Sequence, residues 1–553
     1  MTAQAGILYP ILCEPVVPRD KFRLRSEIFV RMQPMLAPII ARLNVYTHFF
    51  FVPNRLIWDK WEDFITKGAS GTDAPVYPTL TQQVADASDT VLDKNNGAEI
   101  NGVRSLADYL DFQPYYSSKD HAQVDKSWQS LNLQQYDALP FRAYHLICDE
   151  YYRDQNLQHP YCYNIFERDG SAVEFDQTML TRFTSGNTAV PLARGTIYSV
   201  WELRRRAWEK DYFTSALPWP QRGADVQIPF GSSVAPVVYR NNDKKIGLLR
   251  HYSGTSFSNT SGTVAYSLSP NDSPGVRVMS DGETAINYDP NGTLQADLTS
   301  AVGATINDLR RSIKLQEFYE KDARGGSRYI EKILSHFGVR SSDARLQRPE
   351  YLGGGVSPII ISDVVQQSES TSNSPLGQYA GHGVSAQVTH QFKRSFEEHG
   401  FVIGILSIMP KATYMNGTPR KYLKRDFFDF YWPEFANLGE QPIFEQELFT
   451  NTRMTNNPLT DNANNKIFGY TPRYAEYKFI HGKVKGDFRD TLSYWHMGRN
   501  FASAPTLSEA FVYEKPTDRI WPVTDNSADP FLIQIYHQLS AMRPMPKFGV
   551  PMI

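Results

Sequence analysis

Cysteine is scarce in this sequence, and long apolar segments are missing. Only three cysteines, Cys13, Cys148 and Cys162, occur among the 553 residues. This number excludes the disulfide framework of small secreted domains and indicates synthesis in a reducing compartment. The chain has no run of about eighteen apolar residues, and no basic segment followed by an apolar one opens it. We therefore expect neither membrane insertion nor a secreted precursor.

The sequence also lacks an excess of positive charge. Lys and Arg number 57 and Asp and Glu number 59, which gives a formal net charge of −2. A protein that condenses nucleic acid on its own needs surplus Lys and Arg to neutralise phosphates, so this role is excluded. A weakly basic face on part of the surface is still compatible with these numbers. Aromatic residues are plentiful at 13%, and they can bury a large apolar area.

Sequence signatures of catalysis are absent. There is no phosphate-binding Gly-Lys-Ser/Thr loop, no dinucleotide-binding glycine motif, no HExxH and no GxSxG. His145 and Cys148 are three residues apart on a predicted helix, but no second pair completes a metal site, so burial in a core is favoured. Asp426 and Asp429 are better explained as turn or interface carboxylates than as an acid–base pair. We expect a protein that is not an enzyme and has no cofactor or metal.

An aromatic strand followed by a helix is predicted near the N-terminus. Residues 43–52 alternate two sets of β-branched and aromatic side chains, which is typical of a strand buried on both faces. Pro53 ends this strand, and Asn54 is a suitable N-cap for a helix. The residues predicted to share the apolar face of that helix are Trp58, Trp61, Phe64 and Ile65. The resulting core or interface cluster consists of Phe49, Phe51, Trp58 and Trp61.

Hydrophobic periodicity predicts further elements. Helices are expected over residues 139–157, 201–213 and 304–338. Gly325 and Gly326 interrupt the last of these helices. The continuous apolar run at 400–410 predicts a buried strand, and residues 384–396 alternate as its pairing partner. The proline-rich tail at 540–553 is expected to lie as an arm across another surface.

The composition changes between residues 224 and 302. This stretch is rich in Gly, Ser, Thr, Asn and Asp, and it contains short apolar alternations. Such a composition predicts an inserted, β-rich and exposed subdomain rather than a core. The remaining segments, 1–223 and 303–553, then form one core domain with insertion helices and the C-terminal arm.

Seven motifs, spread in order from about residue 25 to residue 515, resemble one family. They are FFFVPNRLIWDKWEDF, LPFRAYHLICDEYYRDQNL, YFTSALPWPQRG, SHFGVRSSDARLQRPEYLGG, FANLGEQPIFEQELF, FGYTPRYAEYKF and TLSYWHMGRNFASAPTLSEAFV. The family is that of the major capsid proteins of microviruses, in particular the gokushovirus-like group. The resemblance covers most of the chain apart from 67–104 and 224–302.

This resemblance implies a mainly β fold, namely an eight-stranded antiparallel jelly-roll sandwich with long loop insertions and several helices. It also implies self-assembly around circular single-stranded DNA into a T=1 icosahedral shell, which is found in the virion and assembled in the cytoplasm of a bacterial host. The implied partners are further copies of the chain, the packaged DNA, a small basic DNA-binding virion protein, a DNA pilot protein and a host cell-surface receptor.

The resemblance also suggests functional residues. The insertion at 224–302 corresponds to a protrusion at the threefold axis. Its apolar residues contact symmetry mates or a receptor at the tip, or else pack inside the protrusion; they are Ile246, Leu248, Leu249 and Tyr252. The basic residues expected to face the DNA are Arg204, Arg205, Arg310, Arg311 and Lys314. For the run of arginines at 204–206, a solvated helix face is the alternative.

Two other functions are compatible with parts of the sequence. A phage spike or adhesin would use the loops at 224–302 for binding. A carbohydrate-active enzyme would use the many Trp and Tyr residues as sugar-stacking platforms and Asp426 and Asp429 as its carboxylates. Such an enzyme is normally secreted, and the sequence shows no leader.

Overall fold

The protein is described from a computed structural model. The residues that it describes are 1–68, 71–73, 75–81, 104–112, 135–158, 202–224, 226, seven short strands between 237 and 296, 306–326, 328–365, 379–450, 465–522 and 529–545. The chain divides into two compact units. One consists of Met1–Pro220 and Asp322–Ile553, and the other of Gln221–Lys321.

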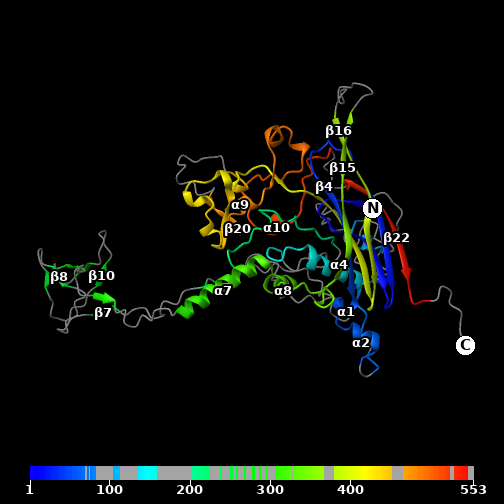
Figure 1. The fold of residues 1–553 in the computed structure, drawn as a ribbon, viewed down its shortest axis with the longest axis horizontal. Coiled ribbons are helices and arrows are strands. Elements are labelled where there is room, and N and C mark those ends of the chain that lie inside the picture. The colour runs from blue at the N-terminus through cyan, green and yellow to red at the C-terminus, as the bar shows by residue number, and fades with distance from the viewer. Residues whose placement is uncertain are drawn as a thin grey trace. The chain divides into compact units, whose positions relative to one another are not determined.

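The first unit contains two large antiparallel sheets (Figure 1). The five-stranded sheet has the order β1 (Thr2–Ala3), β22 (Phe531–Met542), β3 (Lys21–Met32), β16 (Tyr379–Ser395) and β15 (Ile360–Val365). The four-stranded sheet has the order β14 (Glu350–Pro358), β4 (Leu43–Pro53), β17 (Gly400–Pro410) and β2 (Tyr9–Val16). Strands from both ends of the chain are therefore neighbours, and a mainly β fold is confirmed.

The two sheets pack face to face. Buried and exposed residues alternate along β3, so that Leu24 and Ile28 point into the core. The ring of Phe49 in β4 lies 5.4 Å from the ring of Phe392 in β16, measured between centroids. Residues of both sheets share two buried apolar clusters. The hydrophobic effect in this interior supplies the main favourable free energy of folding.

The predicted strands at 43–52 and 400–410 are confirmed as β4 and β17, which pair with each other. Every residue of β17 is buried, because Val402 faces the other sheet while Ile403 packs in a cluster with helix α4 (Leu139–Ile147). The predicted pairing of 400–410 with 384–396 is wrong. Residues 384–396 belong mostly to β16, which pairs with β3 and β15 in the opposite sheet. Alternation identifies a strand, but it does not specify the sheet that the strand joins.

The helix predicted after Pro53 is divided into two short helices. Helix α1 (Asn54–Ile57) has Pro53 rather than Asn54 at its N-cap position. It ends at Trp58, whose backbone is extended (φ −151°, ψ 111°), and α2 (Trp61–Thr66) follows. Trp58 is buried, but Ile65 is 50% exposed, so its predicted place on the buried face is wrong. The short helices let Trp58 turn inward, where its ring packs on Trp61 (6.3 Å).

The helix predicted at 139–157 is confirmed over most of its length. It comprises α4 and a π-helical turn, η2 (Cys148–Tyr152), and it ends where Arg153 becomes extended. Pro140 lies in the first turn, where a missing N–H costs nothing. All residues of α4 are buried, because the helix packs between the four-stranded sheet and helices α1 and α3 (Leu106–Tyr109).

The helix predicted at 201–213 is wrong. The described part of this segment pairs through single bridges, Ile7 with Arg205 and Ala207 with Tyr513, and it enters a turn at residue 212. The backbone N–H of Leu8 donates to the oxygen of Arg204 at 2.8 Å. Hydrogen bonds to distant segments satisfy the backbone here, and this tertiary pairing overrides the helical periodicity of the side chains.

The interrupted helix predicted at 304–338 is confirmed. It consists of α7 (Ile306–Gly325) and α8 (Tyr329–Phe337), and Gly326 between them has a φ of 94° that favours glycine. No described helix has the length and apolar character needed to cross a bilayer.

Short strands complete the second unit. One antiparallel sheet has the order β10 (Ser267–Ser269), β11 (Arg277–Met279), β12 (Ala285–Asn287), β8 (Arg250–Tyr252) and β9 (Phe257–Ser258). A separate pair is formed by β13 (Leu294–Ala296) and β7 (Val237–Tyr239).

Small pairs and helices occupy the loops of the first unit. The strand pairs are β5 (Thr79–Thr81) with β6 (Gln135–Asp137), β18 (Thr413–Tyr414) with β21 (Gly482–Lys483), and β19 (Glu440–Phe444) with β20 (Ile467–Pro472). Among the described residues, the remaining α-helices are α9 (Ala475–Lys478) and α10 (Glu509–Val512). The C-terminal tail begins later than predicted, because residues 540–542 still belong to β22; residues 546–553 lie outside the described part of the chain.

Candidate functional site

The three consecutive arginines lie on an extended segment, so their interpretation as a solvated helix face is wrong. Arg204 donates from Nε to Nδ1 of His145 at 3.3 Å, and Arg205 donates to a backbone oxygen at 3.3 Å. The guanidinium of Arg206 lies 4.6 Å from the centroid of the Tyr46 ring. All three side chains therefore make contacts within the subunit. A contact of Arg204 and Arg205 with DNA stays a prediction.

The residues that the sequence suggested as metal ligands or acid–base groups are held by contacts within the fold. His145 and Cys148 are buried, and burial raises the pKa of the Cys148 thiol. Asp429 accepts hydrogen bonds from the backbone N–H groups of Arg425 (2.8 Å) and Asp426 (3.0 Å), and these bonds lower its pKa. The Asp426 carboxylate accepts from the backbone N–H of Phe427 at 2.6 Å, so both aspartates stabilise a turn, which is one of the two alternatives for them, turn or interface carboxylates. Across the described residues, no group of three His, Cys, Asp or Glu side chains is placed to hold a metal ion.

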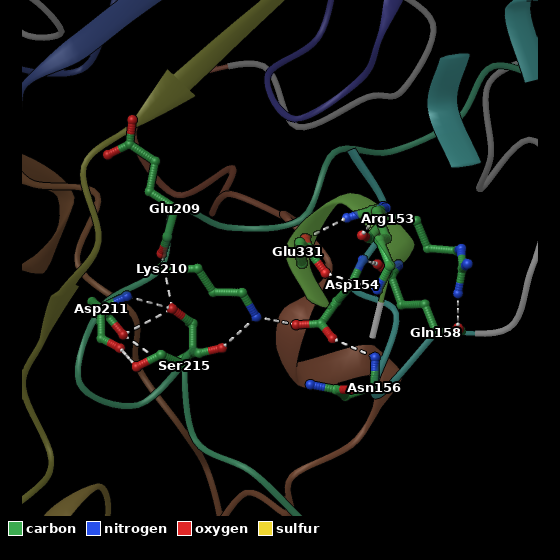
Figure 2. A network of polar contacts seen from close by, with 11 residues as sticks. Arg153, Asp154, Asn156, Gln158, Glu209, Lys210, Asp211, Ser215 and Glu331 are labelled. Carbon is green, nitrogen blue, oxygen red and sulfur yellow. Dashed lines mark hydrogen bonds and ion pairs between the residues drawn. The ribbon is translucent and has the colours of Figure 1, made fainter. Parts of the chain in front are cut away.

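A polar network connects the end of η2 to the segment around residue 210 (Figure 2). The Asp154 carboxylate pairs with the ammonium of Lys210 and accepts from the backbone N–H of Asn156 at 2.9 Å. Arg153 donates to the backbone oxygen of Gln158 at 2.7 Å. Arg153 and Asp154 are both less than a tenth exposed. Such mutually satisfied buried groups fix the geometry of a loop, so we interpret this network as structural.

The other predicted contact residues lie on the second unit. Arg310, Arg311 and Lys314 are exposed on α7, and Lys314 donates to Glu317 at 2.6 Å. Of the proposed tip residues, Ile246, Leu248 and Leu249 lie outside the described residues, and Tyr252 ends strand β8.

Sequence reasoning missed a group of exposed aromatic side chains at 422–432. We call it the aromatic patch, and each member is between 45% and 70% exposed: Tyr422, Phe427, Phe428, Phe430, Tyr431 and Trp432. The rings of Phe427 and Phe428 are 3.8 Å apart. The run FFDFYW was a usable signal, because it shows neither helical nor strand alternation.

Exposed apolar side chains also occur on α7 and α8. Leu309, Ile313 and Phe318 on α7 are 39–50% exposed, and Tyr329 and Phe337 on α8 are at least 70% exposed. Monomeric soluble proteins rarely leave large apolar patches in water, and such patches mark protein–protein contacts. Apolar side chains exposed on several elements of a β-sandwich are typical of a subunit that associates with other subunits.

Comparison with known proteins shows which structural proteins this chain resembles. A family model described as "Capsid protein (F protein)" matches residues 1–100 and 113–553. The capsid protein VP1 of Bdellovibrio phage phiMH2K is 34% identical over 555 residues, which cover 98% of this chain and 92% of the relative. The capsid protein VP1 of Chlamydia phage 1 is 34% identical over 594 residues, with 100% and 93% covered. The capsid protein VP1 of Spiroplasma virus 4 is 28% identical over 567 residues, with 99% and 92% covered.

The chain therefore belongs to this phage capsid protein family. It is a structural major capsid protein of a small bacteriophage, as the sequence motifs predicted.

Proposed function

We propose that copies of this chain close into a T=1 icosahedral shell around single-stranded DNA, with an eight-stranded jelly roll as the shell-forming core. The strand lengths support this architecture. Eight strands of the two sheets have between 6 and 17 residues, four in each sheet, whereas β1 has only 2. Packed antiparallel sheets of this kind are the usual form of a jelly roll.

The observation that carries the proposal is the exposure of the aromatic patch between Phe427 and Trp432. Burying one large apolar side chain stabilises an interface by about 1.5–3 kcal/mol. A subunit without neighbours lacks this stabilisation. Tyr, Trp, Phe and Arg are also the residues enriched in the buried centres of protein interfaces. In a closed shell each subunit contacts several neighbours, which accounts for apolar surfaces on separate elements.

The segment 224–302 is proposed to form the protrusion at the threefold axis. Two observations support its independence from the shell core. Residues Gln221–Lys321 form a compact unit of their own, and the strands there have only two or three residues. Its apolar residues would meet symmetry mates or a host receptor. Short strands with long connections tolerate sequence change, which suits a surface that recognises a host.

The near-neutral charge of the chain supports one of the remaining partners, and the others are those that the family resemblance implies. With a formal net charge of −2, the shell cannot neutralise a packaged genome alone. We propose that a small basic virion protein supplies most of that charge, that a DNA pilot protein accompanies the genome, and that assembly takes place in the bacterial cytoplasm. Exposed Arg310 and Arg311 remain candidates for DNA contact.

Electron microscopy of the purified full-length protein tests the proposal. Uniform icosahedral particles of small diameter are expected. Trimers or pentamers that never close would instead support the spike alternative. Stable monomers at high concentration that cleave glycans would contradict a shell function altogether.

A further inference from the structure

A cationic pocket adjoins the aromatic patch, because Tyr422 belongs to both. The pocket is a cavity of about 420 Å³ in the first unit. Its cationic lining residues are Arg420, Lys421, Lys483, Lys485 and Arg489, and its acidic lining residues are Glu447 and Glu476. The lining thus carries a net charge of +3, although the whole chain is nearly neutral.

Three short elements bring these cations together. The 3-10 helix η4 (Arg420–Tyr422) provides Lys421 and Tyr422. Strand β21, which pairs in parallel with β18, provides Lys483. The 3-10 helix η9 (Gly486–Arg489) follows and ends with Arg489, whose Nε donates to the backbone oxygen of Val484 at 2.8 Å. These backbone-anchored elements hold the positive groups around one cavity.

The two carboxylates of the pocket are already engaged. Glu447 accepts from the hydroxyl of Tyr212 at 2.9 Å and pairs with Arg420 at 3.5 Å. Glu476 pairs with Arg420 at 4.0 Å and accepts from Gln441 at 2.7 Å. The other four cations have no carboxylate within 4.0 Å among the residues that the structure describes.

Crowding of like charges makes the empty pocket electrostatically unfavourable. Burial lowers the pKa of Lys483, and Lys421, Lys485 and Arg489 lower it further. Burial and Lys483 likewise lower the pKa of His481 to about 4, so this imidazole adds no charge at neutral pH. An anion placed among these groups would relieve the repulsion, since opposite charges favour the protonated form of a lysine.

An aromatic face lies next to the cations. The Tyr422 ring is 70% exposed. The ammonium of Lys421 lies 5.1 Å from its centroid, and that of Lys483 lies 5.8 Å from it. Cations that follow a phosphate backbone, together with aromatic rings on which bases stack, are the features by which proteins bind single strands without reading sequence.

We propose that this pocket binds single-stranded nucleic acid, with a phosphate among Lys421, Lys483, Lys485 and Arg489 and a base stacked on Tyr422. The inference deepens the proposed function, because it rests on that function for the source of the nucleic acid. The nucleic-acid contact is thereby assigned to residues other than those predicted from the sequence, which were Arg204, Arg205, Arg310, Arg311 and Lys314. A short acidic polypeptide satisfies the charges equally well, but it gives no account of the exposed aromatic ring beside Lys421 and Lys483.

The test uses dissociated full-length subunits and a fluorescein-labelled oligodeoxythymidylate, with binding followed by fluorescence anisotropy over a series of salt concentrations. The pocket variant is Lys421→Glu with Lys485→Glu, both at exposed positions. Its matched control, Lys67→Glu with Lys515→Glu, makes the same change of charge at exposed positions that do not line the pocket. Tyr422→Ala removes the ring, and Tyr422→Phe retains it.

The pocket variant should bind at least tenfold more weakly, and the slope of log K against log salt should fall by about 0.7, because one phosphate contact is lost. Tyr422→Ala should lose about fivefold or more, and Tyr422→Phe should bind like the parent. Equal losses in the pocket variant and its control would overturn the inference. So would equal affinity for poly-glutamate together with unchanged binding by Tyr422→Ala. Subunits bind the probe before assembly, so a failure to form shells would contradict the proposed function and leave this inference standing.

Discussion

Phe49 and Phe392 meet across the two sheets, with their ring centroids 5.4 Å apart and their planes tilted by 47°. Phe49 is completely buried and Phe392 is 5% exposed. Phe49 lies in a strand predicted from its aromatic pattern, and Phe392 lies in a strand that was assigned to the wrong sheet. Their contact shows that the sandwich is held together by pairs far apart in the sequence, and forming such a pair requires the closure of a long loop.

Phe49→Ala should lower the free energy of unfolding of the subunit by about 3–5 kcal/mol, because it leaves a cavity between the sheets. Urea denaturation of dissociated subunits measures this change. The control is Phe29→Ala on β3, whose side chain is half-buried on the outer face and should cost about 1 kcal/mol. Equal losses for both variants would contradict the packing described for the two sheets.

Trp58→Ala should prevent soluble folding or particle assembly. Its buried ring packs against Phe64 (5.1 Å) and Tyr77 (5.4 Å), and loss of a buried Trp costs about 3–5 kcal/mol. Particle yield from the expression host is the measurement. Ile65→Ala serves as the control, because Ile65 is half exposed on the neighbouring helix. A normal yield from the Trp58 variant would show that α1 and α2 are wrongly placed.

His481→Phe should reduce the loss of stability on acidification. Burial, Lys483 and Lys421 lower the pKa of His481 to about 4 from 6.5, although Asp211 raises it. The unfolded chain therefore binds a proton more readily, so stability falls as the pH decreases from 6.5 towards 4. The variant should remove about 1–3 kcal/mol of that fall. Denaturation at pH 7 and pH 4.5 compares the two proteins.

Part of the acid sensitivity should persist in this variant, because burial also lowers the pKa values of His496 and His537. His537→Phe provides the comparison at a site remote in sequence. If His481→Phe follows the same pH curve as the parent, the buried neutral state of His481 is wrong.

Phe427→Ser with Phe430→Ser should block assembly without unfolding the subunit. Both rings are more than half exposed, and exposed substitutions usually change stability by no more than about 0.5 kcal/mol. Analytical ultracentrifugation should show soluble subunits in place of particles. The control Val76→Ser changes an exposed side chain outside the aromatic patch and should leave assembly intact. Normal shells from the double variant would exclude the aromatic patch from the interfaces.

Replacement of residues 230–298 by a short linker should leave the sandwich folded, because the strands concerned belong to the Gln221–Lys321 unit. Far-ultraviolet circular dichroism and thermal unfolding would monitor folding, and infectivity or trimer contacts should change. Unfolding of the whole chain would refute the proposal that this segment is an insertion.

Local pattern predicted some elements well and others poorly. The strand at 400–410 was recognisable because a continuous apolar run of that length must be buried on both sides. The segment at 201–213 has helical periodicity, yet its backbone pairs with residues near 7 and 513. Neither partner is visible from the local sequence, because the pairing depends on how distant loops close.

The candidate sites were harder to predict than the strands. Exposed and buried aromatic runs look alike in a sequence, so the aromatic patch was overlooked. The predicted cluster of Phe49, Phe51, Trp58 and Trp61 divides between two buried clusters, because Phe49 and Phe51 face the opposite sheet whereas Trp58 and Trp61 pack beside α4. The cationic pocket combines residues from about 420 and from about 485. Their like charges meet only because β18 and β21 pair. The spacing of these cationic residues along the chain did not predict that they line one cavity.

By itself, the sequence determined the family, the mainly β composition and the central strands, because ordered motifs and uninterrupted apolar runs are local properties. Only the tertiary structure decided which strands share a sheet, which aromatic rings stay in water and which cations gather around one cavity. Those outcomes depend on contacts between residues hundreds of positions apart, and the free energy of such contacts is not encoded in any single segment.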